Sequence, residues 1–262
     1  MSAPTRFLGV DLAVRATNTG LALLEINARR AYASRPEVTA SDDELVRLVD
    51  AATVVGLDAP LGWPTEFVEL VRRHGDFSGP DTWDVSRLRY RATDRFVAQL
   101  TGRAPLSVSA DLIGAVAMRA AGLQTRWATA WGAAQHRDGS GRLVEVYPRA
   151  ALWAWALRPS GAPYKGATNV ERRRATRDAR AAILAQLTDR APWLSFSAEL
   201  HEQCVNSDDV LDALVSALVA WAASRGQTHH AATEEYDLDL VRREGWIHVP
   251  SRPLDELDPA RD

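Results

Sequence analysis

The amino-acid sequence predicts an α/β fold in which helices flank a mixed sheet and a helical insertion divides its strands. Three apolar runs separated by turn residues, at 6–12, 20–26 and 29–34, are typical of strands in an antiparallel meander. A helical pattern and a fourth apolar run at 53–58 follow, and this strand–helix–strand unit implies parallel pairing with a right-handed crossover. Helical patterns between Gly- and Pro-containing breaks then predict an insertion over about 61–140.

The helix that precedes the fourth strand has clear start and face signals. Ser41 can cap its first turn, and Glu44, three residues later, completes a capping box. Leu45, Leu48 and Val49 supply one apolar face at helical spacing. This helix is therefore expected to pack on the sheet and to return the chain to the strand at 53–58.

The insertion and the C-terminal part of the chain are predicted to be mainly helical. Helices are expected near 64–74, 91–101, 109–124, 149–158, 170–189 and 208–225. A fifth strand is expected at 143–147, and the run Trp246-Ile247-His248-Val249 predicts a short edge strand. The residues from about 250, rich in Pro, Asp and Arg, are predicted to form a loose tail. Without repeats or a low-complexity linker, residues 1–262 are expected to form one domain.

Composition narrows the class of protein. The chain has 262 residues, of which 46% are hydrophobic and 25% charged, as in an ordinary soluble enzyme. The net charge of −3 means that a polyanion would have to bind a local basic patch. Cys204 is the one cysteine, which excludes an internal disulfide and a Cys-rich metal site and favours a cytoplasmic location. No apolar run reaches the roughly 18 residues of a spanning helix, so no membrane partner is expected.

Acidic residues stand at the ends of two predicted strands. Asp11 ends the first strand and Asp58 ends the fourth. If these strands are neighbours in a parallel pair, both acids project at the edge of the sheet where ligands bind in such folds. Buried carboxylates need partners, and a hard divalent cation such as Mg²⁺ or Mn²⁺ takes carboxylate oxygens as ligands. Each acid taken alone is equally compatible with a turn or capping role.

A third acidic feature opens the most apolar helix of the chain. Asp209 and Asp212 are three residues apart in the run 208–212 and therefore share a helix face. Asp212 lies between Leu211 and Ala213, deep in the apolar stretch, and is predicted to bind metal together with the two strand acids. Asp209 is a candidate catalytic residue, although a favourable charge at a helix N-terminus explains it as well.

Further candidates for catalysis and substrate binding lie elsewhere in the chain. Glu145 interrupts an apolar strand and is a candidate catalytic residue, or else a half-exposed strand acid. Lys165, in a Gly- and Pro-containing loop, is a candidate phosphate clamp, or else a solvated side chain. Four arginines next to aromatic residues suit phosphate contacts and base stacking, unless they form a solvated or acid-paired helix face. They are Arg87, Arg89, Arg91 and Arg95.

Several short motifs, taken together, resemble those of a known family. They are Gly-Val-Asp at 9–11, Asp-Ala-Pro-Leu-Gly at 58–62, Arg-x-Thr-Asp-Arg at 91–95, Glu-Val-Tyr-Pro at 145–148 and Tyr-Lys at 164–165, followed by the acidic helix. The set is similar to the family filed as domain of unknown function 429, a predicted nuclease family, over nearly the whole chain. The order of elements also resembles the ribonuclease H-like fold, which implies a mixed five-stranded sheet.

The acidic helix resembles one particular branch of that fold. Asp209 and Asp212, followed by Ala213 and Leu214, are similar to the paired acids of RuvC-type Holliday-junction resolvases. Such proteins usually carry Gly two residues after the first acid, where this chain has Ala13, and they have Glu as the second acid. The resemblance implies a metal-dependent nuclease in which Asp11, Asp58 and Asp212 bind Mg²⁺ or Mn²⁺ and the substrate is nucleic acid.

Two other classes of function stay open at this point. A sugar-kinase-like or actin-like ATP-binding protein shares the core topology, but the chain offers no second Asp-x-Gly phosphate loop and no Gly-rich adenosine segment. A non-catalytic nucleic-acid-binding protein on the same fold would show no dependence on metal. The sequence leaves the type of nucleic acid open, and also the oligomeric state, a dimer included.

Overall fold

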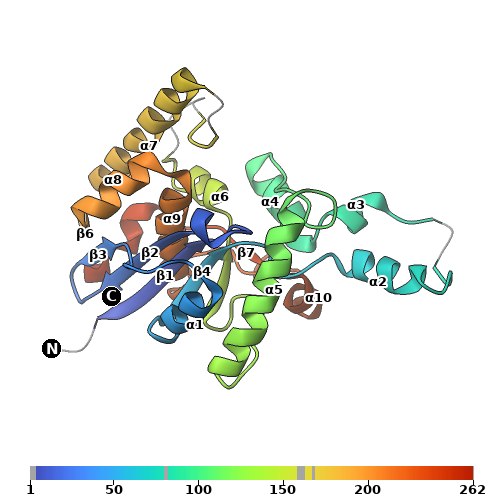
Figure 1. The fold of residues 1–262 in the computed structure, drawn as a ribbon. Coiled ribbons are helices and arrows are strands. Elements are labelled where there is room, and N and C mark those ends of the chain that lie inside the picture. The colour runs from blue at the N-terminus through green and yellow to red at the C-terminus, as the bar shows by residue number, and fades with distance from the viewer. Residues whose placement is uncertain (1–3, 80–81, 158–162, 167–168, 262) are drawn as a thin grey trace.

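The computed structural model describes residues 4–79, 82–157, 163–166 and 169–261. Within these residues the chain forms a mixed sheet of seven strands in the order β6-β3-β2-β1-β4-β5-β7 (Figure 1). The strands are β1 (Thr5–Asp11), β2 (Gly20–Ile26), β3 (Ala31–Ser34), β4 (Val54–Asp58), β5 (Leu143–Val146), β6 (Leu194–Phe196) and β7 (Ile247–His248). Strand β2 is antiparallel to β1 and β3, and the other neighbouring pairs are parallel. The predicted α/β class with a mixed sheet is confirmed.

The expected number of five strands is wrong, because two short strands extend the edges of the sheet. Strand β7 lies within the run 246–249 that predicted an edge strand. Strand β6 has three residues and pairs with β3, where Leu194 lies beside Ala31. Three residues are too few for an alternating pattern to be visible, so β6 could not be predicted from a strand pattern.

Helices cover both faces of the sheet and form one apolar core on each. Successive side chains of β1 contribute to opposite cores. Phe7 contributes to the core under α9 (Asp208–Ser224), whereas Leu8 and Val10 contribute to the core under α1 (Asp42–Asp50) and α5 (Ile113–Ala130). The first core is closed by α6 (Pro148–Ala154), α7 (Val170–Arg190) and α8 (Ala198–Asn206). Every residue from Val210 to Ala222 is buried, so α9 is a central helix that packs against protein on all sides.

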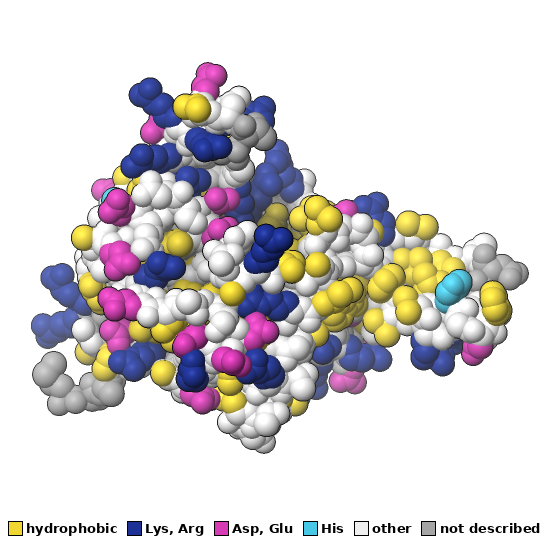
Figure 2. Space-filling view, viewed as in Figure 1, with side chains coloured by type: hydrophobic (Ala, Val, Ile, Leu, Met, Phe, Trp, Pro, Cys, Tyr) yellow, Lys and Arg dark blue, Asp and Glu magenta, His cyan; other side chains and the backbone are white. Residues whose placement is uncertain are grey.

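The residues between β4 and β5 form the predicted helical insertion. It consists of α2 (Thr65–His74), α3 (Val85–Arg89), α4 (Ala92–Thr101) and α5. Helices α2 and α3 project from the body as an arm (Figure 1), and neither contains a buried residue. Hydrophobic side chains gather on this arm in Figure 2, and Val68, Val71, Phe77 and Val85 are among those exposed. Helix α4, in contrast, packs with α10 (Leu238–Glu244) and β7 in a third apolar cluster.

The C-terminal residues are packed and are not the loose tail that the sequence predicts. Leu254 and Leu257 lie on a short 3-10 helix (Leu254–Leu257), and both are buried in the core under α9. A second 3-10 helix (Pro259–Arg261) follows. Burial of two leucines spaced three residues apart is therefore enough to hold this otherwise polar segment against the core. Among the described residues, no helix combines the length and apolarity that crossing a membrane requires.

Candidate metal centre

Three carboxylates from distant parts of the chain meet at one edge of the sheet. Asp11 and Asp58 are the last residues of β1 and β4, and they are direct partners in the parallel register of these strands. Asp212, in the second turn of α9, points to the same place. Each of the three offers one carboxylate oxygen, and these oxygens all lie within 4.8 Å of one another. The structure thus brings together the three residues that the sequence predicts as metal ligands.

Glycines on the sheet allow α9 to come close enough for this meeting. A Cβ atom on Gly9 of β1 would lie 1.8 Å from the carbonyl oxygen of Ala213, and one on Gly56 of β4 would lie 2.2 Å from that of Ser216. On β2, a Cβ on Gly20 would lie 2.0 Å from the carbonyl oxygen of Asp209. The helix backbone therefore rests directly on three adjacent strands, and this seating places Asp212 beside the ends of β1 and β4.

The carboxylates are crowded and poorly hydrated, which favours their protonated forms. Burial, with the negative charges of Asp58 and Asp212, raises the pKa of Asp11 well above its usual range. Burial also raises the pKa of Asp58 to about 7, although Lys165 opposes this rise. The pKa of Asp212 rises to about 6, again through burial and against the effect of Lys165. Desolvation and mutual repulsion both disfavour the ionised carboxylates, and a cation placed among the three groups would stabilise their ionised forms.

Two neighbouring side chains hold Asp212 in place. The hydroxyl of Tyr164 donates a hydrogen bond to Oδ1 of Asp212 at 3.1 Å, and the ammonium of Lys165 forms an ion pair with Oδ2. The side chain of Asp212 has no exposed surface, whereas that of Lys165 is 44% exposed. Burial opposes a charge on Lys165, but Asp212 and Asp58 outweigh this effect and raise its pKa. The predicted phosphate clamp thus lies against an acid of the triad.

The donor set of the triad suits a hard divalent cation. Asp11, Asp58 and Asp212 contribute carboxylate oxygens, and no His or Cys belongs to the group. Such all-oxygen sets match Mg²⁺ and Mn²⁺ better than Zn²⁺ or copper, which prefer nitrogen and sulfur. Asp11 and Asp58 are partly exposed, so water and a ligand can reach the oxygens from solvent. Asp209 is also partly exposed and lies outside the triad, where its charge only weakly affects Asp11.

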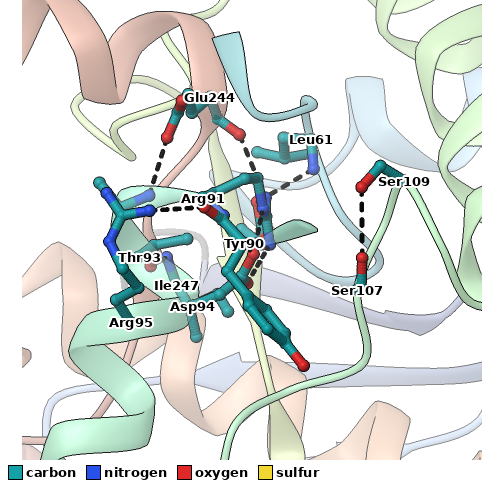
Figure 3. A network of polar contacts seen from close by, with 12 residues as sticks. Leu61, Tyr90, Arg91, Thr93, Asp94, Arg95, Ser107, Ser109, Glu244 and Ile247 are labelled. Carbon is teal, nitrogen blue, oxygen red and sulfur yellow. Dashed lines mark hydrogen bonds and ion pairs between the residues drawn. The ribbon is translucent and has the colours of Figure 1, made fainter. Parts of the chain in front are cut away.

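The structure places Glu145, predicted for catalysis, and Arg91, predicted for substrate binding, in one buried ion pair, and both line a small pocket together with Asp58. Both side chains are 2% exposed, and the guanidinium of Arg91 donates to both carboxylate oxygens of Glu145 at 2.9 and 2.7 Å. Arg91 also pairs with the buried Asp94 at 2.9 Å (Figure 3), and the backbone N–H of Leu61 donates to Glu145. A single acid in an apolar strand can either bind a metal ion or form a buried ion pair, and Glu145 forms a buried ion pair.

This ion pair belongs to a buried polar network that joins the insertion to the sheet. The carboxylate of Glu244, at the end of α10, accepts hydrogen bonds from the backbone N–H groups of Thr65 and Ala92 at 2.7 and 2.8 Å. The hydroxyl of Thr93 accepts one from the N–H of Ile247 in β7 at 2.7 Å. The motif at 91–95 therefore has a structural explanation. Sequence analysis missed Glu244, because its partners are about 150 or more residues away.

The other predicted substrate-binding arginines make local contacts within the insertion. Arg87 forms ion pairs with Glu66 at 3.1 Å and Asp84 at 3.6 Å. Arg89 lies over the ring of Tyr90, 5.2 Å from its centroid, and Arg95 donates to the carbonyl oxygen of Tyr90 at 2.6 Å. The structure therefore does not gather the four arginines into one phosphate-binding patch.

Arg91→Met is expected to destabilise the protein by about 3–5 kcal/mol, because it leaves the Glu145 and Asp94 carboxylates buried without their cation. The matched control is Arg89→Met, two residues away on the exposed side of α3, which is expected to change stability by less than about 0.5 kcal/mol. Urea denaturation of the two variants measures both effects. Similar losses for the two would show that the buried network contributes little.

Comparison with known proteins identifies the family of the chain. The family model described as "Protein of unknown function (DUF429)" matches residues 9–236, most of the chain and all three acids of the triad. No curated protein and no solved structure shows a significant match. Because the family model covers well over half of the chain, including the end of β1, β4 and the helix α9 that carry the candidate centre, the chain belongs to the DUF429 family.

Proposed function

We propose that this protein is a metal-dependent nuclease that hydrolyses phosphodiester bonds in nucleic acid. The observation that carries the proposal is the meeting of Asp11, Asp58 and Asp212, whose carboxylate oxygens lie within 4.8 Å of one another at the carboxyl ends of parallel strands. The order β3-β2-β1-β4-β5 at the centre of the sheet is compatible with the ribonuclease H-like arrangement expected from the sequence. The further strands β6 and β7 would be additions at its edges.

The residues of the centre have distinct tasks under this proposal. Asp11, Asp58 and Asp212 would hold Mg²⁺ or Mn²⁺, and Tyr164 would fix the orientation of Asp212 through its hydrogen bond. A bound divalent cation supplies activation of water and neutralisation of charge on the phosphate. The partial exposure of Asp11 and Asp58 leaves an approach for a phosphodiester from solvent.

The test is cleavage of single-stranded and branched DNA and of RNA with Mg²⁺ or Mn²⁺. Asp212→Asn is expected to lower the rate roughly a hundredfold or more, because it removes a ligand charge from the centre. Asp208→Asn is the matched control on the same helix, since Asp208 lies 3.9 Å from Arg180 and outside the triad. Cleavage that survives unchanged in Asp212→Asn would come from a contaminant or from another site, and it would refute the assignment.

A cavity beside the arm offers a surface for the nucleic acid. It has a volume of about 590 Å³, and its lining includes Trp63, Trp83, Arg137 and Arg243 together with the carboxylates Glu66 and Glu69. Arginines already pair with both carboxylates, whereas Arg137 donates to Gln124 and to the carbonyl oxygen of Arg243. Half-buried indole rings beside guanidinium groups are suited to base stacking and phosphate contacts. Under this proposal the cavity, rather than the candidate arginines at 87–95, contacts the nucleic acid.

Arg137→Gln combined with Arg243→Gln is expected to weaken binding of a fluorescent 20-nucleotide single strand roughly tenfold and to lower the salt dependence, because two phosphate contacts are lost. The measurement is fluorescence anisotropy in EDTA, which prevents cleavage. Arg29→Gln with Arg30→Gln removes the same charge from the exposed turn between β2 and β3 and serves as control. Equal losses for the two double variants would exclude a specific role for the cavity.

A further inference from the structure

Lys165 is unusual in the composition of this chain. The sequence has 31 Lys and Arg residues, and Lys165 is the one lysine among them. Arginine presents a planar fork of five donors, whereas lysine carries a compact charge on a flexible stem. The protein uses arginine at all its other Lys and Arg positions and has its one lysine, a compact charge on a flexible stem, beside the acidic triad.

Lys165 is placed to balance part of the negative charge of the triad. Its ammonium contacts Oδ2 of Asp212, and its charge also interacts with Asp58 and Asp11, so it serves all three acids. Its side chain is 44% exposed and approaches from the solvent side, while the carboxylate that it contacts is fully buried. When all three carboxylates are ionised, the single positive charge of Lys165 balances only one of their negative charges.

We propose that Lys165 is the resident counter-cation of the metal-free triad, and that a divalent metal ion displaces its ammonium from Asp212. A cation held by Asp212 together with Asp11 and Asp58 would share the Asp212 carboxylate with the Lys165 ammonium, and like charges at one carboxylate repel at a few ångströms. The four-carbon stem lets the ammonium leave without movement of the backbone. Once released, the ammonium is free to contact a substrate phosphate, a step that rests on the proposed nuclease function.

Lys165→Met tests the competition. Removing the ammonium is expected to tighten Mn²⁺ binding roughly tenfold by isothermal titration calorimetry, within the usual range of coupling between two competing ligands. Lys165→Arg keeps the charge and serves as the matched control, with an affinity within about threefold of the parent. An unchanged or weaker affinity for Mn²⁺ in Lys165→Met would overturn the proposal.

A second measurement uses the unmodified protein and does not depend on a variant that folds. An amine-reactive reagent labels Lys165 and the N-terminal amine, and peptide mass spectrometry separates the two. Saturating Mn²⁺ is expected to speed labelling of Lys165 several-fold, because the ammonium leaves its ion pair, and to leave the N-terminal amine unchanged. Slower or equal labelling of Lys165 with metal bound would refute displacement.

The two measurements separate this inference from the proposed function. A parent protein that binds no divalent metal would refute the metal centre and this inference together. A parent that binds metal, with neither the affinity of Lys165→Met nor the labelling rate changed, would refute the inference alone and leave the nuclease proposal standing.

Discussion

Asp58→Asn is expected to stabilise the metal-free protein at pH 8 and, at the same time, to remove its stabilisation by Mg²⁺. The first effect follows from the charge that the substitution deletes. Burial raises the pKa of Asp58 to about 7, whereas in the unfolded chain this carboxyl titrates near 3.9. Ionised Asp58 therefore opposes folding above pH 7, by about 2–4 kcal/mol.

The sign of the pH dependence follows from the direction of this shift. A carboxyl group with a raised pKa binds its proton more tightly in the folded state than in the unfolded state. Its favourable contribution to stability is complete below about pH 4 and is lost as the pH rises through about 7. The advantage of Asp58→Asn over the parent should therefore be largest at pH 8 and should shrink as the pH falls towards 4.

Thermal denaturation with and without metal measures both effects. In EDTA at pH 8 the variant is expected to melt above the parent. With Mg²⁺ at about 100 times its Kd, the parent should gain about 2.7 kcal/mol and the variant should gain little, because a ligand is missing. Asp189→Asn, at an exposed position near the end of α7, is the matched control and should follow the parent in both conditions.

Two outcomes would contradict this interpretation of the triad. A variant less stable than the parent in EDTA would mean that the ionised carboxyl of Asp58 is compensated by its surroundings. A parent whose melting temperature does not respond to Mg²⁺ or Mn²⁺ would mean that the triad holds no metal, whatever its geometry.

The positions of the three acids could be predicted because each depends on local patterns and one topological rule. An acid at the end of an apolar run lies at the end of a buried strand, and the strand–helix–strand unit predicts a parallel orientation for the fourth strand. That this strand lies beside β1, which makes Asp11 and Asp58 direct partners, is a condition that the structure meets. Helical spacing then gives Asp212 a defined face of α9. The position of each acid within its own element therefore follows from local sequence. Only the packing of α9 on the sheet depends on contacts between remote residues.

The contacts that could not be predicted involve residues whose partners are remote in sequence. Glu145 and Arg91 are 54 positions apart, and nothing local distinguishes an acid that binds a cation from one that pairs with arginine. Leu254 and Leu257 looked like part of a loose tail, because the core that receives them is built from other segments. Burial of this kind is a property of the assembled fold, so the sequence pattern alone could not reveal it.

Composition adds a second signal for Lys165. Its position in a loop leaves a phosphate clamp and a solvated side chain both open, and it is also the one lysine among 31 Lys and Arg side chains. Lysine is rare in this chain, and here it follows an aromatic residue in a Gly- and Pro-containing loop. Its use there indicates a role that differs from those of the many arginines. The structure adds what composition lacks, namely the contact between this ammonium and Asp212.

The second large effect is expected for Gly9→Ala, a change of one methyl group. The new Cβ would lie 1.8 Å from the carbonyl oxygen of Ala213 and 2.6 Å from the backbone nitrogen of Ala217. Both atoms belong to the backbone of α9 and cannot rotate away as a side chain could. Relief requires that α9 move off the sheet, where its residues from Val210 to Ala222 are buried. We expect a loss of about 3 kcal/mol or more, or roughly 6–12 °C in Tm.

Gly122→Ala is the matched control, and it should have the opposite sign. Gly122 lies in the middle of α5, and a Cβ there would meet no atom within 4 Å. Replacing a helical glycine by alanine in open space is expected to stabilise the protein by about 0.5–1 kcal/mol. Thermal and urea denaturation compare the two variants directly, since both add the same methyl group. Equal effects would show that the helix and sheet are not in backbone contact at Gly9.

The Gly9 substitution also connects packing with the candidate metal centre. Asp212 immediately precedes Ala213, the residue whose carbonyl oxygen the new methyl group would displace. A shift of α9 away from β1 therefore carries the carboxylate of Asp212 away from Asp11 and Asp58. The folded fraction of Gly9→Ala, measured below its melting temperature, is expected to bind Mn²⁺ at least tenfold more weakly than the parent, as for loss of a residue that supports a metal ligand. Parent-like affinity in that fraction would show that the triad can form without close seating of the helix.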